Sequence, residues 1–374
     1  MARSSILERR AGRITDPVER LRFLRREMCL PPKAPYHRRS GLRHVASLIS
    51  GLVILVAIVP LPMGTAETFA KERRLLGEED DLRAATVPAP RVWLVEHSDS
   101  LEVYSNGLRI DLTFAVSNRP RRRFPIFSRI AGAQREAIGS SPIGIVYHTT
   151  ESNLAPFEEE ENRRLQRLAR YSIEAVRQER AYHYVIDRFG RVHRVVQETD
   201  AANHAGASIW ADGQGVYVNL NDSFLGVSFE GQTGSADDVT PAQVAAGKVL
   251  TEMLRWRYGI STEDCVTHAQ VSVNPRNMLI GDHTDWAGKF PFAGVGLPDN
   301  YSLPLASLYV FGFEYDAVFL QMTGTRWRGL ELAELQVARR AAAEGLETKR
   351  YRAILQHRYK DIENALKEQS EGGS

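Results

Sequence analysis

The spacing of apolar and polar positions predicts several strands along the middle of the chain. Apolar and polar residues alternate over Val92–Asn118, with turn residues at Ser105–Gly107, a pattern typical of a β-hairpin. A short apolar run, Ile143–His148, indicates a buried strand with a polar residue at its end. Two β-rich runs around a glycine predict a second hairpin over Ala181–Val196, and Phe224–Gly231 predicts a further strand.

Two segments between these strands have the signals of helices. The middle of Glu151–Arg180 is charged and has a helical period, which predicts a surface helix. In the second segment Thr240 is a predicted N-cap, Pro241 takes the first helical position, and Gly259 ends the helix. Strands and helices do not follow a strict βαβ repeat. We therefore expect an α/β protein of the mixed α+β kind, with a central mixed β-sheet flanked by helices.

The last part of the chain changes in character. From Tyr301 the sequence is aromatic and apolar, and Leu330–Lys367 then predicts two helices broken near Gly345. No repeat and no chemical motif occurs here. We expect a mainly helical extension whose role is packing or contact with a partner.

The N-terminal part has the pattern of a membrane anchor. Val45–Met63 is uncharged over nineteen residues, enough for a transmembrane helix. Before it, Met1–His44 carries twelve Lys and Arg against four Asp and Glu, and the acidic stretch Gly77–Asp81 follows it. The positive-inside rule then predicts a single-pass protein of a bacterial inner membrane, with a cytoplasmic N-terminus and a periplasmic remainder. Secretion after signal cleavage is the alternative, but the basic stretch is long for a signal peptide.

The amino-acid composition argues against several classes of protein. Of the 374 residues, 43% are hydrophobic and 25% are charged, which is typical of a globular chain. A formal net charge of only +2 gives no support for nucleic-acid binding. The two cysteines, Cys29 and Cys265, would lie on opposite sides of the membrane and could not pair. A disulfide scaffold is therefore excluded, and Cys265 is expected to be a buried structural residue rather than a metal ligand.

One polar stretch, Cys265–Phe292, contains candidate metal ligands. His268 follows a short β-prone run, and Asp285 lies in a loop beside glycine. His148, at the end of an apolar strand, adds a second imidazole. Two imidazoles and one carboxylate form a zinc ligand set that leaves a fourth position for water, whose pKa falls to about 7. From these residues alone, a polar loop without metal is the other interpretation.

The sequence resembles a known family in an ordered set of blocks. These occur over about Ile138–Leu297 and read IVYHTTE, AYHYVIDRFGRVHRVV, NHAGAS, NDSFLGVSFEGQ, TPAQ and VTHAQVSVNP…GDHTDWAG. They are similar to the zinc-dependent N-acetylmuramoyl-L-alanine amidases, the type shared with peptidoglycan recognition proteins and phage T7 lysozyme. The resemblance implies that fold, and it implies that His148, His268 and Asp285 bind Zn²⁺.

The resemblance also implies candidate catalytic residues. One branch of the family uses a glutamate where this chain has Ser228, and the other branch uses a tyrosine, which Tyr182 matches. Glu230 has the same strand parity as Ser228 and is kept as a second candidate base.

Further residues are assigned by the same resemblance. His283 occupies a position where the family often has lysine, and it is a candidate for stabilising the oxyanion when protonated. The stretch before Asp285 is longer than is usual in the family, so Asp282 and His283 stay open as alternative third ligands. His204 and Asn203 are candidate substrate contacts.

The resemblance, together with the predicted anchor, thus implies a membrane-anchored, Zn²⁺-dependent amidase. It would hydrolyse the amide between the lactyl group of muramic acid and L-alanine, so its partners would be peptidoglycan or muropeptides and the membrane, with no nucleic acid. A receptor of the same fold that binds peptidoglycan without cutting it is the alternative, and the complete ligand set favours the enzyme. A zinc peptidase is disfavoured because no HExxH motif occurs.

These expectations divide the chain into six segments. They are a basic cytoplasmic head (Met1–His44), a transmembrane helix (Val45–Met63), a stalk (Gly64–Pro90), a β-rich accessory segment (Arg91–Ile130), a zinc amidase domain (Ala131–Asn300) and a helical C-terminal extension (Tyr301–Ser374).

Overall fold

The computed structural model describes residues 88–129, 133–234 and 239–371. The predicted transmembrane helix Val45–Met63 and the basic head before it lie outside these ranges. In the ranges described, no helix combines the length and the apolar character that crossing a bilayer requires.

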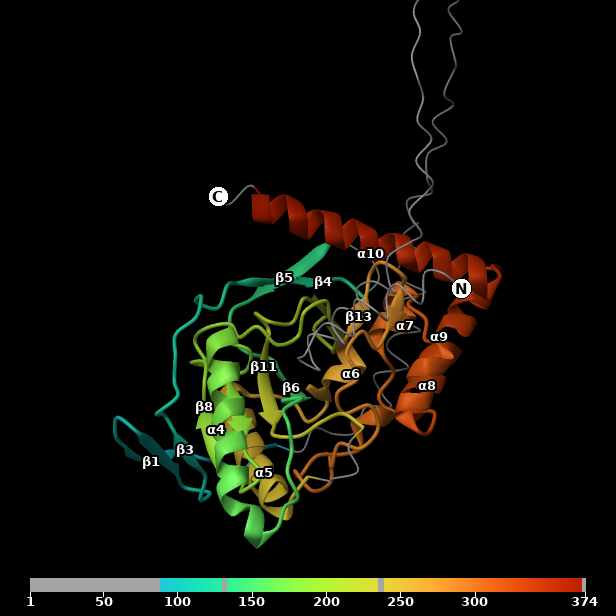
Figure 1. The fold of residues 1–374 in the computed structure, drawn as a ribbon. Helices are drawn as coiled ribbons and strands as arrows, with labels where there is room; N and C mark the ends of the chain where they lie inside the picture. Colours follow the sequence, from blue (N-terminus) through green and yellow to red (C-terminus); the bar gives the residue numbers. More distant parts are fainter. Residues whose placement is uncertain (1–87, 130–132, 235–238, 372–374) are drawn as a thin grey trace, which may run out of the picture. The chain divides into compact units, whose positions relative to one another are not determined.

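A mixed eight-stranded sheet forms the centre of the fold (Figure 1), in the order β1-β2-β3-β8-β7-β11-β6-β12. Strand β11 runs parallel to β6 and β7, and β12 runs parallel to β6, whereas β7 and β8 are antiparallel. This confirms the mixed α+β class predicted from the sequence. The strands are β1 (Leu94–His97), β2 (Leu101–Tyr104), β3 (Arg109–Asp111), β6 (Gly144–Thr149), β7 (Tyr184–Ile186), β8 (Val192–Arg194), β11 (Phe224–Phe229) and β12 (Cys265–Thr267).

The middle strands β6 and β11 are buried along their whole length, as expected of strands covered on both faces. Successive side chains point to opposite faces of the sheet. Tyr147 therefore faces helix α5, where its hydroxyl lies 2.8 Å from the Thr251 hydroxyl. Val146 and His148 face the other side, where Val146 packs in a smaller apolar cluster with Trp210.

Helix α5 (Pro241–Tyr258) has the ends that the sequence predicts. The Thr240 hydroxyl accepts a hydrogen bond from the Gln243 backbone N–H, and the Gln243 side chain accepts one from the Thr240 N–H. This capping box satisfies two backbone donors that helix geometry leaves without partners. Gly259 ends the helix in the left-handed conformation, at φ +68°.

Helix α4 (Asn162–Glu179) is the predicted surface helix, and it packs on the face of the sheet opposite α5. Its buried residues Ile173 and Val176 belong to one apolar cluster with Val185 and Val195 of the β7–β8 hairpin. The two helices thus cover opposite faces of the same strands, and both can be followed in Figure 1.

Short strands outside the central sheet complete the β-structure. A four-stranded sheet has the order β5-β4-β10-β9, and β13 pairs with β14. These strands and the short helical turns are β4 (Phe124–Phe127), β5 (Arg135–Gly139), β9 (Ile209–Ala211), β10 (Val216–Val218), β13 (Val273–Asn274), β14 (Leu279–Ile280), η1 (Glu159–Glu161), α6 (His268–Val271) and η2 (Asn300–Ser302).

The C-terminal part is helical, as predicted. The predicted pair broken near Gly345 is present as α9 and α10, and two shorter helices precede it within the aromatic stretch. Side chains of these helices, among them Phe311, Val337 and Tyr359, belong to the same apolar core as Tyr147. The helices are α7 (Ala306–Phe311), α8 (Ala317–Thr323), α9 (Arg328–Ala343) and α10 (Thr348–Glu371).

Candidate metal centre

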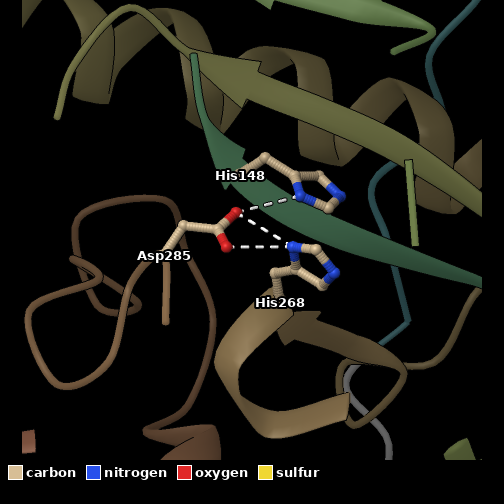
Figure 2. Close-up of side chains that lie close together, drawn as sticks. All are labelled: His148, His268 and Asp285. Carbon is tan, nitrogen blue, oxygen red and sulfur yellow. Dashed lines mark hydrogen bonds and ion pairs between the residues drawn. The ribbon is translucent and has the colours of Figure 1, made fainter. Parts of the chain in front are cut away.

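Three segments bring the predicted ligands to one edge of the central sheet. His148 lies in β6, His268 is the first residue of α6 directly after β12, and Asp285 lies in the loop after β14. Because β6 and β12 are parallel neighbours, their carboxyl ends meet at the same edge, which is where α/β sheets commonly place ligand sites. Figure 2 shows the three side chains pointing toward one another.

The distances within this group are those of a compact site. His148 Nδ1 lies 3.1 Å from Asp285 Oδ2. His268 Nδ1 lies 2.9 Å from Asp285 Oδ1 and 3.2 Å from Oδ2. One ligand atom from each residue can be chosen so that all three lie within 4.8 Å of one another, and all three residues are buried.

These residues fit a zinc ion. A tetrahedral Zn²⁺ binds nitrogen and oxygen ligands at about 2.0–2.2 Å, which sets neighbouring ligand atoms about 3.3 Å apart. The nitrogen–oxygen separations of 3.1 Å and 2.9–3.2 Å are close to that value. Two imidazoles with one carboxylate are also a donor set found in zinc sites that keep one position open.

The protonation states of His148 and Asp285 favour the binding of a cation. Burial, together with the neighbouring His268, lowers the pKa of His148 to about 4. Burial alone would raise the pKa of Asp285, but His268 and the hydrogen bonds from both imidazoles hold that pKa well below its usual range. His148 is therefore neutral and Asp285 ionised at neutral pH, the forms in which they bind metals.

Tyr182 lies beside the group. Its ring centroid is 4.9 Å from that of His148, and its hydroxyl donates to the Thr149 carbonyl oxygen at 3.4 Å. Burial and the negative charge of Asp285 raise the pKa of Tyr182 above its usual value. The phenol therefore stays protonated at neutral pH and is available as a hydrogen-bond donor.

The two alternative third ligands lie outside the group. Asp282 is exposed, and its Oδ1 accepts a hydrogen bond from Asn274 Nδ2 at 2.8 Å. The His283 ring stacks on the His268 ring, with centroids 4.7 Å apart and an angle of 14°. Burial and His268 lower the pKa of His283, which works against the protonated role predicted from the sequence. Asp285 is the residue that meets both imidazoles.

Glu230, the second candidate base, lies in different surroundings. Its side chain is buried, and its Oε2 accepts a hydrogen bond from the Arg188 backbone N–H at 3.0 Å. It lines a small cavity of about 100 Å³ together with Thr149 and Trp286, which are sequence neighbours of His148 and Asp285. Burial raises its pKa to about 7.

The two predicted substrate contacts are placed differently from each other. His204 is only 6% exposed, and its Nδ1 lies 3.2 Å from His148 Nε2. Asn203 is exposed and turns toward the end of α4, where its Nδ2 donates to the Glu179 carbonyl oxygen at 3.1 Å. The structure thus brings His204 to the metal group and Asn203 to a helix end.

Cys265 is buried in β12 and does not belong to the group. Its thiol donates to the Ser261 carbonyl oxygen at 3.5 Å, and burial raises its pKa to about 12. A thiol with so high a pKa is unreactive at neutral pH, as predicted for a structural cysteine.

Sequence reasoning missed Asn221, which stands near the site. Its Oδ1 accepts hydrogen bonds from the backbone N–H groups of His204 and Ala205, at 3.0 and 2.7 Å. The asparagine is part of the NDSFLGVSFEGQ block, so its place in the motif was a signal. Its partners could not be named because they belong to another loop.

Comparison with known proteins gives the same family as the sequence blocks. Residues 139–286 match the profile of the Amidase_2 family, described as N-acetylmuramoyl-L-alanine amidase. The resemblance stated from the sequence is therefore confirmed for this segment. No curated protein matches the chain.

Solved structures of several amidases are similar to part of the chain. LysC of Clostridium intestinale is 22% identical, with a TM-score of 0.27, and the match covers 41% of this chain and 83% of LysC. AmpDH3 of Pseudomonas aeruginosa, solved with an anhydromuramic pentapeptide, is 21% identical, with a TM-score of 0.34 and coverage of 52% and 73%. AmiD of E. coli is 20% identical, with a TM-score of 0.27 and coverage of 46% and 58%.

Proposed function

We propose that the segment 139–286 is a zinc-dependent N-acetylmuramoyl-L-alanine amidase. It would hydrolyse the amide between the lactyl group of muramic acid and L-alanine in peptidoglycan or in soluble muropeptides. The observation that carries this proposal is that His148 meets His268 and Asp285 at one buried point, although Asp285 lies 137 positions after His148. The Amidase_2 match of the same segment supports the reaction class.

The three ligands would hold the zinc ion through His148 Nδ1, His268 Nδ1 and the Asp285 carboxylate. When bound, zinc supplies Lewis-acid polarisation of a carbonyl oxygen and lowers the pKa of a water ligand to about 7. The remaining groups of the chain would position the substrate, donate hydrogen bonds and move a proton.

Tyr182 is the protein group best placed to assist the reaction. Its protonated hydroxyl would donate a hydrogen bond to the oxygen on which negative charge develops, and one such donor contributes about 3–4 kcal/mol. His283 is proposed as a second donor, through the N–H of its neutral imidazole, from its position against the His268 ring. Glu230 remains a candidate base; at a pKa of about 7 it could exchange a proton at neutral pH.

We further propose that Val45–Met63 anchors the protein in a bacterial inner membrane with the amidase segment in the periplasm. The uncharged run and the basic stretch before it support this topology. Reporter fusions placed after Arg83 test it. A reporter that is active only in the cytoplasm would contradict the topology.

Two substitutions test the ligand assignment in one assay. His148→Ala should lose both zinc and amidase activity, because it removes one of three protein ligands. His283→Ala should keep zinc and lose roughly 10²–10³-fold in rate, as when an oxyanion donor is removed. The measurement is zinc content of the purified variants beside hydrolysis of a muramoyl-peptide.

Each variant has an outcome that rejects its assignment. Full zinc occupancy of His148→Ala would exclude His148 as a ligand. An empty site in His283→Ala would make His283 the third ligand in place of Asp285. Zinc-loaded wild-type protein that binds muropeptides but releases no peptide would support the receptor alternative.

A further inference from the structure

The loop that carries His204 contacts both histidine ligands at their Nε2 atoms. His148 Nε2 lies 3.2 Å from His204 Nδ1, and His268 Nε2 lies 3.4 Å from the carbonyl oxygen of Ala205. These are the ring nitrogens that do not face Asp285. Histidines that bind a metal through one nitrogen usually donate the other N–H to a fixed acceptor, which sets the tautomer and the ring orientation.

The proton positions in this arrangement follow from a backbone carbonyl. His204 Nε2 lies 3.3 Å from the Phe224 carbonyl oxygen, which can only accept a hydrogen bond. Neutral His204 must therefore carry its proton on Nε2, leaving Nδ1 as an acceptor. With zinc bound at its Nδ1, His148 would then donate through Nε2–H to this acceptor.

The same reasoning applies to the second ligand. The Ala205 carbonyl oxygen is also an acceptor only, so it would take the Nε2–H of His268 once Nδ1 binds zinc. Two acceptors from adjacent residues thus favour, in both histidines, the tautomer in which Nδ1 binds the metal.

Asn221 and Gly226 hold this loop in place. The Asn221 Oδ1 accepts both the His204 and the Ala205 backbone N–H groups, so one side chain fixes the two residues that supply the acceptors. Gly226 of β11 leaves room for the His204 ring, since an added Cβ would lie 2.7 Å from His204 Cγ. The His204 side chain is enclosed between β11 and His148 and is almost entirely buried.

We infer that His204 and Asn221 are positioning residues of the zinc site, His204 by accepting the Nε2–H of zinc-bound His148 and Asn221 by holding in place the loop that contacts both histidines. This rests on the proposed zinc site and gives His204 a role other than the substrate contact predicted from the sequence. Neither residue is assigned contact with zinc or with the substrate.

Zinc affinity, measured by chelator competition on the purified full-length protein, tests this inference without any activity assay. His204→Phe keeps a ring but removes the acceptor, and it should weaken zinc binding 10–100-fold, as observed when such outer partners are lost. Asn221→Leu should also weaken binding, whereas Asn221→Asp keeps the oxygen acceptor and should restore most of the affinity. His193→Phe, at a buried histidine paired with Asp111 away from the site, is the matched control and should bind zinc as the wild type does.

The hydrogen bond itself is read by NMR of the zinc-loaded protein, as the exchange of the His148 Nε2 proton with water. This proton should be protected in the wild type and should exchange faster in His204→Phe. Wild-type zinc affinity in His204→Phe, or equally fast exchange in both proteins, would overturn the inference. If the zinc-loaded wild type shows the protected proton but cleaves no muropeptide, the proposed function fails while this inference stands.

Discussion

At the scale of single residues, the buried surroundings of Glu230 favour the protonated form of its carboxyl group. Burial raises its pKa from 4.5 to about 7, whereas the unfolded chain releases this proton near the ordinary value. The folded form therefore keeps a proton that the unfolded form loses, and stability falls as the pH rises between these two values. The full contribution is present below pH 4.5 and is lost once the pH has passed about 7.

Glu230→Gln should remove this pH dependence. The amide keeps an oxygen acceptor for the Arg188 N–H and cannot ionise. We expect the free energy of unfolding to rise by about 2–3 kcal/mol at pH 8 and to stay unchanged at pH 4. Urea unfolding of the metal-free protein at both pH values measures it, with Glu174→Gln on the surface of α4 as control. An equal effect of Glu230→Gln at pH 4 and pH 8 would show that ionisation of Glu230 does not lower the stability of the folded protein.

The same variant tests Glu230 as the base. If Glu230 moves the proton during hydrolysis, Glu230→Gln should lose most of its activity while keeping zinc. Hydrolysis at the wild-type rate would exclude Glu230 as the base and leave Tyr182, as a hydrogen-bond donor beside the His148 ring, as the remaining catalytic candidate.

At the scale of elements, the sequence predicted best those helices and strands whose ends are marked by local signals. The helix α5 begins after Thr240, with Pro241 first, and ends at Gly259, as expected. The buried apolar strand β6 also lies where the pattern predicted it. The three-residue strands β9 and β10 were not predicted, because so short a strand is defined by its partner rather than by its own period.

The sequence likewise predicted some features of the candidate site and not others. The order of the family blocks was enough to group His148, His268 and Asp285, although His148 and Asp285 are 137 positions apart. It could not tell that Asn203 turns toward α4 while its neighbour His204 turns toward His148. Which way a loop side chain points depends on the segments packed around it, and those segments come from elsewhere in the chain.

Gly312 tests the packing of the C-terminal helices. It ends α7 at φ +68°, and an added Cβ would lie 2.6 Å from the Arg352 carbonyl oxygen of α10. Gly345, between α9 and α10, has a similar φ of +66° but nothing within 4 Å of an added Cβ. Gly312→Ala should lose about 3 kcal/mol of stability, from backbone strain and overpacking together, and Gly345→Ala about 1 kcal/mol from strain alone. Equal losses in denaturant unfolding would show that α7 and α10 do not meet closely at Gly312.

At the scale of the whole molecule, a buried ionic network joins the N-terminal strands to the centre of the sheet. Arg194 of β8 donates two hydrogen bonds of 2.8 Å to the Glu102 carboxylate of β2, and a third, at 3.0 Å, to Glu198. Arg257 of α5 donates to the same Glu198 at 2.7 Å. The strands β1–β3 are thus bonded to the sheet by side chains as well as by the pairing of β3 with β8.

Arg194→Met should destabilise the protein strongly without touching the zinc site. It leaves Glu102 and Glu198 buried with too little positive charge, which costs about 3–5 kcal/mol when one partner of a buried pair is removed. Zinc affinity of the folded fraction should be unchanged. Arg170→Met, which breaks the exposed pair with Glu174, should leave the melting temperature where it is. A similar melting temperature for both variants would reject the network as a source of stability.

We propose that this chain cuts the bond between muramic acid and L-alanine with zinc. The most direct measurement is mass spectrometry of the products released from purified sacculi by the metal-stripped protein, before and after zinc is added back. We expect zinc to restore the release of peptides with a free L-alanine amino terminus and to leave muramic acid with a free lactyl carboxylate. Zinc-loaded protein that releases no such peptide, or products cut at another bond, would contradict it.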